Sequence, residues 1–327
     1  MQLPFTVCNV KKVNRVMNHA SIPPTIVFCV TGELHLIYLN WSINSLLRHE
    51  YENIFVLVGT AKEKAIVNAW FPDIELEIVS VDIGEYPGFS YKPFALKKWI
   101  KSGGSSCIAG PIVVCDADIL WKRNPEPLFR RFGGQCWVHK ITAVNPSDYD
   151  LSAQNVPKSN IGLRTIMNYH AKEGVTEFPN FILNAGLFKL EKDPFLVMVE
   201  SWMDKILKLP PSEMLMSEAL MSLTYAELGL VPIADQTDIK HFGKHLKNSF
   251  SGSVFPFATV PPDASKHETG YEVATHYYGD QRLKLHEDVR RLDLDPDGLA
   301  PTAKRLRAID TRRKRVGRLK KFLRIPG

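Results

Sequence analysis

The sequence has few cysteines, no long apolar run and no secretory leader pattern, and each absence narrows the class of protein. No stretch approaches the roughly 18 consecutive apolar residues that a membrane-spanning helix needs. The start, MQLPFTVCNVKKVNRV, lacks the basic-then-apolar order of a secretory signal, so we expect a cytoplasmic protein. The five cysteines show no C-x-x-C spacing, and Cys29 and Cys115 lie in apolar strand patterns, which favours reduced core side chains.

The composition is that of a folded protein with an unusual C-terminal charge. Hydrophobic residues make up 45% of the 327 residues, enough to bury a sizeable core in one or two α/β domains. Residues 303–327 carry a net charge of +10, and subtracting this from the overall +6 leaves −4 for the rest. Residues 291–302, with three aspartates and two prolines, are typical of a linker. We therefore expect a main domain at 1–290, a linker at 291–302 and a basic amphipathic tail at 303–327.

Strand and helix patterns alternate through the first 120 residues. Apolar runs predict strands at 25–30, 53–59, 74–81 and 111–120, and helical spacing predicts helices at 34–47, 62–70 and 93–100. This order predicts an α/β fold, in which helices cover a parallel or mixed sheet. Ligands bind such sheets at the carboxyl ends of the strands.

The most informative stretch is PIVVCDADIL, residues 111–120, an apolar run that ends in two aspartates separated by one small residue. The run is typical of a strand buried on both faces, which would deliver Asp116 and Asp118 to the edge of the sheet. Two carboxylates there form a hard-oxygen site for a divalent cation, and such a cation can bind a diphosphate. A bare Asp-x-Asp triplet also occurs at ordinary polar turns, but the buried strand before it favours a metal site.

A second group of polar residues lies far downstream, in EVATHYYGDQRLK. An imidazole at His276 could complete the shell of a cation, and Gly279 would let backbone approach a phosphate. Arg282 or Lys284 could neutralise negative charge. Taken alone, the same pattern also fits a half-exposed histidine in a turn.

Three segments together resemble a known family. DADILWKRNPEPLF (116–129) resembles the metal motif of GT-A fold, nucleotide-sugar-dependent glycosyltransferases of the glycogenin and lipopolysaccharide-galactosyltransferase group, often called family 8. FILNAGLFKL (181–190) is similar to the Asn-Ala-Gly segment of that family, and the downstream His-x-x-Gly-x-x-Arg is similar to its closing motif. The resemblance covers residues 25–285 and implies a Rossmann-like mixed sheet covered by helices.

The resemblance implies a set of site residues. It implies that Asp116, Asp118 and His276 ligate Mn²⁺ or Mg²⁺, with a nucleotide sugar as co-substrate. It implies catalytic roles for Asp116 and Asn184, and the carboxylate of Glu218 is a third catalytic candidate on chemical grounds. The donor-binding positions that it implies are Val30, Thr31, Lys92, Ala117, Gly186, Gly279 and Arg282. Of these, Val30 and Thr31 would line the nucleoside pocket, while Lys92 is either a donor contact or a solvated charge at a helix start.

The sequence departs from the family at several positions. Ser217 stands where many relatives have an acidic residue, and Glu218 stands at the position of their glutamine. Glu218 could act as a nucleophile under the sugar, or it could be a charged residue at a helix N-terminus. Arg282 replaces the closing lysine, and arginine binds phosphate with a different geometry. Sugar specificity is therefore open.

The function that we expect is transfer of a hexose from a UDP-sugar to a glycan or lipid-linked acceptor, with retention of configuration. The alternative is an inactive GT-A domain that binds sugar nucleotides or nucleic acid. A nucleotidyltransferase is disfavoured because no Gly-rich loop follows the first strand. The basic tail fits peripheral binding to an anionic membrane, which we favour over nucleic acid or solvated disorder. Gly317 and the basic run 312–315 argue against a stable isolated helix.

Overall fold

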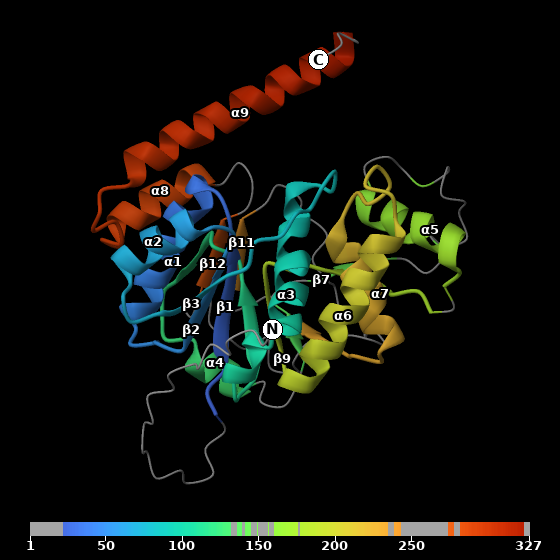
Figure 1. Cartoon of the computed structure of the whole chain (residues 1–327), viewed down its shortest axis with the longest axis horizontal. Helices are drawn as coiled ribbons and strands as arrows, with labels where there is room; N and C mark the ends of the chain where they lie inside the picture. The colour runs from blue at the N-terminus through green and yellow to red at the C-terminus, as the bar shows by residue number, and fades with distance from the viewer. Residues whose placement is uncertain are drawn as a thin grey trace, which may run out of the picture.

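The computed structural model describes residues 22–131, 136–138, 141–144, 149, 156, 160–175, 177–234, 239–242, 274–277 and 282–323. A mixed sheet of seven strands lies at the centre, in the order β10-β6-β9-β4-β1-β2-β3 (Figure 1). Four parallel strands form one side of this sheet: β1 (Thr25–Val30), β2 (Ile54–Val58), β3 (Glu75–Ile78) and β4 (Ile112–Cys115). The remaining three are β9 (Leu187–Leu190), β6 (Trp137–Val138) and β10 (Ile233–Ala234), and β9 is antiparallel to β4. The α/β fold predicted from the sequence is confirmed.

Two smaller sheets flank the central one. One has the order β11-β12-β5, from β11 (Ile239–Phe242), β12 (Ala274–Tyr277) and β5 (Ile119–Trp121). The other pairs β7 (Ile141–Ala143) with β8 (Phe181–Leu183). The sheet of β5 joins two segments far apart in the sequence, because β12 pairs antiparallel with β5.

Helices cover both faces of the central sheet (Figure 1). One face packs against α1 (Glu33–Leu47), α2 (Ala61–Trp70), α4 (Glu126–Arg131), α8 (Arg282–Arg291) and the start of α9 (Ala300–Leu323). The other face packs against α3 (Tyr91–Lys101), α6 (Lys192–Lys208) and α7 (Ser217–Glu227), while α5 (Ile161–Glu173) packs on α7. Short 3₁₀ turns at Gly88–Ser90 and Gly104–Cys107 flank α3.

The strand β1 shows why an unbroken apolar run marks the centre of this sheet. Ile26 and Phe28 pack into the core on the α1 face, while Val27 packs into the core on the α3 face, and none of the three is exposed. A strand covered by helices on both sides needs apolar residues at every position, so its sequence does not alternate.

Strand order predicts a ligand-binding crevice beside β1. The chain leaves β1 through α1 to reach β2 on one side, and it later reaches β4 on the other side. The order of the strands therefore switches direction between β1 and β4, and ligands of open α/β sheets bind at the carboxyl ends of the strands beside such a switch. The first residues after these two strands are Thr31 and Asp116.

The segment expected to be a linker, 291–302, is hydrogen-bonded to α1. Trp41 Nε1 donates to Asp295 Oδ1 at 2.8 Å, and Asn40 Nδ2 donates to Asp297 Oδ2 at 2.8 Å. The Asp295 carboxylate also accepts two backbone N–H groups at the start of α9. Asp295 and Asp297 attach the segment to the main body, and Asp295 also caps the last helix. The domain boundaries predicted from the sequence stay a prediction.

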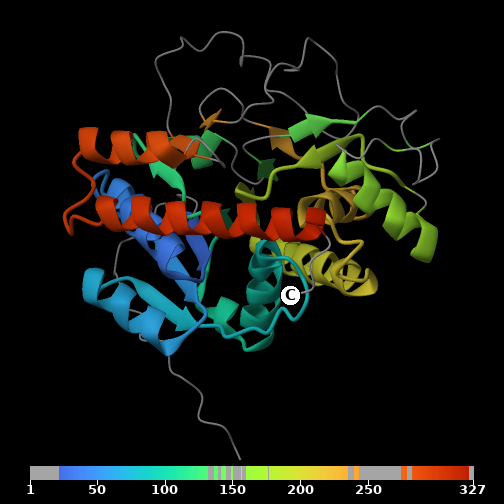
Figure 2. The ribbon, with the colours of Figure 1, turned by 90° about the horizontal axis from the view of Figure 1, so that it is seen from above.

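Helix α9 continues through Gly317, although the composition of the tail argued against a stable isolated helix. Its first turns are anchored, because Ala300 and Ala303 are buried where α9 contacts α1 and α8. An anchored first turn removes the cost of helix nucleation, so the following residues need only propagate it. Residues 311–316 are exposed, and Figure 2 shows α9 extending across the molecule when seen from above. In the part of the chain that the structure describes, no helix is long and apolar enough to cross a membrane.

His286 of α8 is buried against α1. Its ring packs edge-on against Trp41 with the ring centroids 5.2 Å apart, and neither ring nitrogen has a hydrogen-bond partner among the described residues. Burial is the main reason that the pKa of His286 is lowered to about 4, and three nearby cations lower it further while one carboxylate opposes them. The cations are Arg290, Lys304 and Arg307, and the carboxylate is Asp295.

From the lowered pKa of His286, we predict that the protein loses stability in mild acid. Between its unfolded pKa of 6.5 and its folded value of about 4, the unfolded chain binds a proton that the folded chain does not. The free energy of unfolding should therefore fall as the pH decreases through this window, by about 3 kcal/mol in full. Urea unfolding at pH 7 and pH 5 checks this, with His286→Phe expected to lose that part of the pH dependence. The exposed His35→Gln is the control, and equal slopes in wild type and His286→Phe would contradict the prediction.

Candidate functional site

Two aspartates and a histidine meet at the carboxyl edge of the sheet. Asp116 directly follows β4, Asp118 directly precedes β5, and His276 lies in β12 opposite Ile119 of β5. His276 Nε2 lies 3.2 Å from Asp118 Oδ1 and 3.6 Å from Asp116 Oδ2. One ligand atom from each residue lies within 4.8 Å of the other two. The structure thus brings together the three residues predicted as metal ligands.

Strand pairing accounts for this convergence. The backbone N–H of Tyr277 donates to the carbonyl of Asp118 at 3.0 Å, which extends the ladder between β12 and β5. The backbone N–H of Asp116 donates to the carbonyl of Gly186 at 2.7 Å, which continues the pairing of β4 with β9. Each aspartate is therefore held by a different sheet, and the short turn between them fixes their separation.

The burial and the donor set fit a divalent cation. Asp118 is 4% exposed and His276 is 1% exposed, while about a third of the Asp116 side chain reaches solvent. Two carboxylates so close together repel each other unless a positive charge lies between or beside them. Carboxylate oxygens with one imidazole nitrogen suit Mn²⁺ or Mg²⁺. The partly exposed Asp116 leaves one side of the site open to a ligand.

Lys92 points into this site from the first turn of α3. Its Nζ lies 2.5 Å from Asp116 Oδ1 and 2.6 Å from the carbonyl oxygen of Ala185, and its side chain is 13% exposed. Burial alone would lower the pKa of Lys92, but the charge and hydrogen bond of Asp116 outweigh burial, so the pKa is raised. Lys92 is thus a fixed cation beside the acidic pair rather than a solvated charge at a helix start.

Asn184, Ala185 and Gly186 form the turn between β8 and β9. The backbone N–H of Gly186 donates to Asn184 Oδ1 at 2.8 Å, so the side-chain oxygen of Asn184 is turned back on its own loop. A Cβ atom at Gly186 would lie 2.6 Å from His276 Cε1 and 2.9 Å from Asp116 Oδ2. Glycine at this position is therefore required by the packing of His276 and Asp116, two of the residues predicted as metal ligands.

Glu218 lies at the start of α7 and faces the same turn. Its Oε1 accepts the backbone N–H of Ala185 at 3.1 Å. Burial raises the pKa of Glu218, and the charge of Asp116 also raises it, against the opposing effects of the Ala185 hydrogen bond and of Lys92. The carboxylate thus lies in the same group of charges as the three residues predicted as metal ligands, and its catalytic role stays a prediction.

The remaining residues predicted for donor binding differ in accessibility. Val30 is 3% exposed and packs in the core, and Ala117 is buried too, so both can offer a ligand mainly their backbone. Thr31 donates its hydroxyl to Glu63 Oε1 at 3.1 Å. Gly279 and the side chain of Arg282 lie outside the described residues.

Glu63 was not predicted from the sequence. It is buried at the carboxyl edge of the sheet and binds the loops after both β1 and β2. The signal that could have found it is Thr60-x-x-Glu63 at the start of a helix, the pattern of a capping box. The Thr60 side chain does accept the Glu63 N–H, at 3.2 Å, but the carboxylate of Glu63 reaches beyond the helix to other loops.

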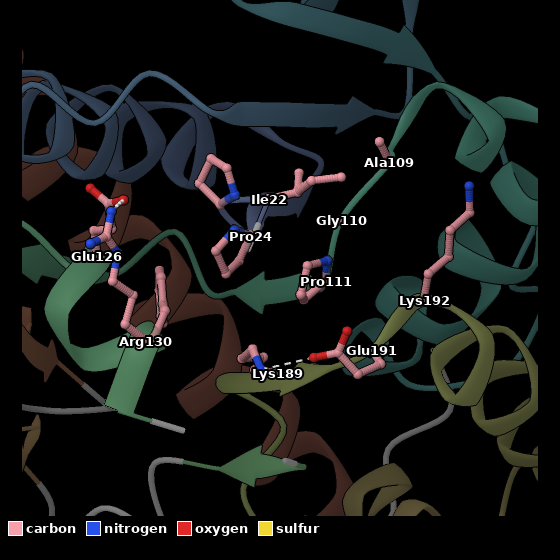
Figure 3. A pocket seen from close by; sticks show the side chains of 12 residues that line it. Ile22, Pro24, Ala109, Gly110, Pro111, Glu126, Arg130, Lys189, Glu191 and Lys192 are labelled. Carbon is pink, nitrogen blue, oxygen red and sulfur yellow. Dashed lines mark hydrogen bonds and ion pairs between the residues drawn. The ribbon is translucent and has the colours of Figure 1, made fainter. Parts of the chain in front are cut away.

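A cavity of about 290 Å³ lies at the opposite edge of the sheet, beside the starts of β1 and β4 (Figure 3). Four of its five charged side chains form ion pairs: Lys189 lies 3.2 Å from Glu191, and Arg130 lies 2.6 Å from Glu126. The fifth, Lys192, donates to the carbonyl of Ile108 at 2.6 Å. Figure 3 shows the Lys189–Glu191 pair along one wall. The cavity contains none of the three residues that meet at the carboxyl edge, and we take that edge as the candidate site.

Comparison with known proteins found no matching family model and no matching curated protein. Among similar solved structures is the galactosyltransferase LgtC with donor and acceptor sugar analogues, 13% identical over 78% of this chain and 87% of that one, with a TM-score of 0.45. Mouse xyloside xylosyltransferase 1 is 14% identical over 79% and 98%, with a TM-score of 0.41. The bifunctional glycosyltransferase WbbM is 16% identical over 82% and 47%, with a TM-score of 0.44.

The packing around Gly186 predicts the effect of one methyl group on metal binding. Gly186→Ala should lower the affinity for Mn²⁺ at least about tenfold, because the new Cβ displaces His276 and Asp116 from their positions. Titration of the protein with Mn²⁺, with free Mn²⁺ followed by electron paramagnetic resonance, measures this affinity. Gly88→Ala is the matched control, since its Cβ would meet open space. Equal affinities in all three proteins would contradict the prediction.

Proposed function

We propose that this chain is a metal-dependent glycosyltransferase that moves a hexose from a UDP-sugar to a glycan or lipid-linked acceptor, with retention of configuration. One observation carries the proposal: Asp116 and Asp118 meet His276, which comes from a distant segment, at the carboxyl edge beside β1 and β4. Two carboxylates this close together, one of them buried, are costly unless positive charge neutralises them. A cation in that crevice suits a diphosphate, and the sequence motifs resemble enzymes whose donors carry one.

The two sides of the crevice would hold different parts of the donor. The side at β4 has the three metal ligands and Lys92, which together suit the diphosphate. The side at β1 has Thr31 and Gly32, which offer hydroxyl and backbone groups and no cation. The nucleoside therefore fits at β1, and the hexose, bonded to the distal phosphate, fits near Asn184 and Glu218.

The chemistry follows from charge. Breaking the bond between the anomeric carbon and the phosphate oxygen leaves negative charge on the departing diphosphate and positive charge on the sugar. The cation that these ligands would hold supplies Lewis-acid stabilisation of the leaving group. Lys92 adds a second positive charge, held in place by Asp116 and by the Ala185 carbonyl. No strong nucleophile is needed for departure of the leaving group.

Glu218 is the side chain best suited to the developing positive charge. Its Oε1 accepts the Ala185 N–H, so the carboxylate is held in one orientation against the turn of residues 184–186. An ionised carboxylate there would stabilise an oxocarbenium ion, and it could also form a covalent intermediate with the anomeric carbon. Both roles require the negative charge, whereas a purely structural role requires only the acceptor oxygen.

This difference gives the test of the proposed function. With Mn²⁺, the protein should release UDP from at least one UDP-hexose, and Asp118→Asn should lose roughly two orders of magnitude of this activity or more. Glu218→Gln keeps an acceptor for Ala185, so its thermal stability should match that of wild type while transfer falls at least about a hundredfold. A thermal-shift panel of nucleotide sugars with and without Mn²⁺ selects the donor.

Three outcomes would count against parts of the proposal. Binding of a nucleotide sugar without any turnover would favour the inactive binding module. Release of pyrophosphate instead of UDP would indicate nucleotidyl transfer. Full activity in Glu218→Gln would leave the metal-dependent reaction intact but remove the proposed role of its carboxylate.

We also propose that the chain functions as a catalytic domain with α9 as a basic surface for anionic membranes. The exposed residues 311–316 include four consecutive cations, 312–315, and the Ile309 and Val316 side chains are 41% and 47% exposed. A helix with exposed basic and apolar side chains suits the surface of an anionic bilayer. In Figure 1, α9 lies on the side of the molecule toward which β1 runs, so bilayer binding would turn the site toward a lipid-linked acceptor.

Vesicle binding checks the role of α9. Arg312→Gln with Arg313→Gln should weaken binding to phosphatidylglycerol-containing vesicles about thirtyfold, at roughly 1 kcal/mol per cation. The matched control, Lys62→Gln with Lys64→Gln on α2, removes the same charge elsewhere and should have little effect. Equal losses in both double variants would contradict a specific role for α9. Tight binding to nucleic acid with steep salt dependence would assign the helix to a different partner.

A further inference from the structure

A buried carboxylate joins the loops at the carboxyl ends of β1 and β2. Glu63, in the first turn of α2, is 8% exposed. Its Oε1 accepts the backbone N–H of Gly32 at 2.6 Å and the hydroxyl of Thr31 at 3.1 Å. Its Oε2 accepts the backbone N–H of Gly59 at 2.9 Å. Both oxygens are therefore used, and each of the two loops is bonded to a different oxygen.

The turn that Glu63 holds has an unusual backbone. Gly32 has φ +86° and ψ 145°, a conformation that residues with a Cβ atom rarely adopt, and it precedes α1. A charge-assisted hydrogen bond from its N–H to a carboxylate fixes this peptide in the orientation that the turn needs. The negative charge of Glu63 thus maintains the conformation of residues 31–32.

The loop after β2 packs closely against the same carboxylate. A Cβ atom at Gly59 would lie 2.9 Å from Thr31 Oγ1 and 3.2 Å from Glu63 Oε2. Tyr91 closes the other side, since its hydroxyl would lie 3.4 Å from that Cβ. There is no room for a side chain between the two loops, so their separation depends on Gly59 and Glu63 together.

Charge distinguishes this part of the crevice from the metal side. Thr31 and Asp116 directly follow neighbouring parallel strands, so the turn held by Glu63 lies at the same edge as the metal ligands. A carboxylate under the turn disfavours a phosphate there, while it leaves an uncharged ribose and base acceptable. The nucleoside end of a nucleotide is therefore the chemistry that this turn fits.

We infer that Glu63 is a positioning residue for nucleoside binding: it holds the Thr31–Gly32 turn in the shape that contacts the ribose and base. The inference rests on the proposed function, since it assumes a nucleotide in the crevice. Glu63 acts through the turn and needs no contact with the ligand. Its loss should therefore weaken binding of the nucleoside part and leave binding of the diphosphate part unchanged.

Calorimetric titration with two probes in the presence of Mn²⁺ separates these parts: UDP, which has a nucleoside, and inorganic pyrophosphate, which has none. In Glu63→Gln an amide NH₂ replaces one acceptor and faces an N–H or hydroxyl donor, so the Kd for UDP should rise at least about tenfold. The Kd for pyrophosphate should change less than about twofold. Gly59→Ala should show the same pattern by wedging the loops apart.

Thr60→Ala is the matched control. It removes the side chain that caps α2 and destabilises the same helix, but it leaves the carboxylate of Glu63 and its three bonds in place. Its melting temperature should fall while its Kd for UDP stays close to that of wild type. A purely structural Glu63 would instead give Glu63→Gln and Thr60→Ala the same ligand affinities.

The outcomes separate this inference from the function on which it rests. Wild-type binding of UDP together with unchanged UDP affinity in Glu63→Gln would overturn the positioning role and leave the proposed function standing. Equal losses for UDP and pyrophosphate in Glu63→Gln would also overturn it, because the defect would then not be confined to the nucleoside side. Wild-type protein that binds neither probe would overturn the proposed function, and the inference with it.

Discussion

The candidate site depends on two aspartates, each of which is held by a different sheet. Asp116 directly follows β4 of the central sheet, Asp118 directly precedes β5 of the smaller sheet, and only Ala117 separates them. The pairing of β12 with β5 adds His276 to the same point. Because each carboxylate is fixed by its own ladder, the repulsion between them cannot be relieved by separation, and the site must be completed by positive charge. Lys92 supplies part of it at 2.5 Å from Asp116.

A second carboxylate site, Glu63, lies at the same edge of the sheet and has a different role. Around Asp116 the carboxylates lie beside the His276 imidazole and the Lys92 cation, whereas both oxygens of Glu63 accept backbone or hydroxyl donors. Bonded in this way, Glu63 organises two loops, while two carboxylates placed close together attract a metal. The edge thus has a cluster of charged side chains after β4 and, after β1, a turn whose nearby carboxylate is bonded within the fold.

Sequence patterns predicted those parts of the molecule whose structure is determined by residues close together in the sequence. The strands β1 and β4 and the helices α1 to α3 follow from apolar periodicity, and Asp116 and Asp118 follow from their place after a buried run. Lys92 could not be decided, because its surroundings come from Ala185, far away in the sequence. From the sequence, Glu63 is an ordinary acidic residue in the first turn of a helix. Its bond to Gly32 depends on the folded structure, which brings the loop after β1 next to this helix. The stretch 291–302 has a linker composition, yet the Asp295 side chain binds Trp41 across the fold.

Glutamate stands at position 218, where the family that the motifs resemble has glutamine, and this extra carboxylate increases the need for a metal. Asp116, Asp118 and Glu218 provide three carboxylates, and Lys92 is the cation among them, so the group carries a net charge of −2 when Glu218 is ionised and His276 is neutral. A diphosphate approaching such a group would be repelled at short range. A divalent cation would cancel this charge. The pKa of Glu218 is raised mainly because burial disfavours its charged form. With glutamine at this position, as in the family that the motifs resemble, the same group would be less negative by one unit, so we expect metal and donor binding to be coupled more tightly with glutamate than with glutamine.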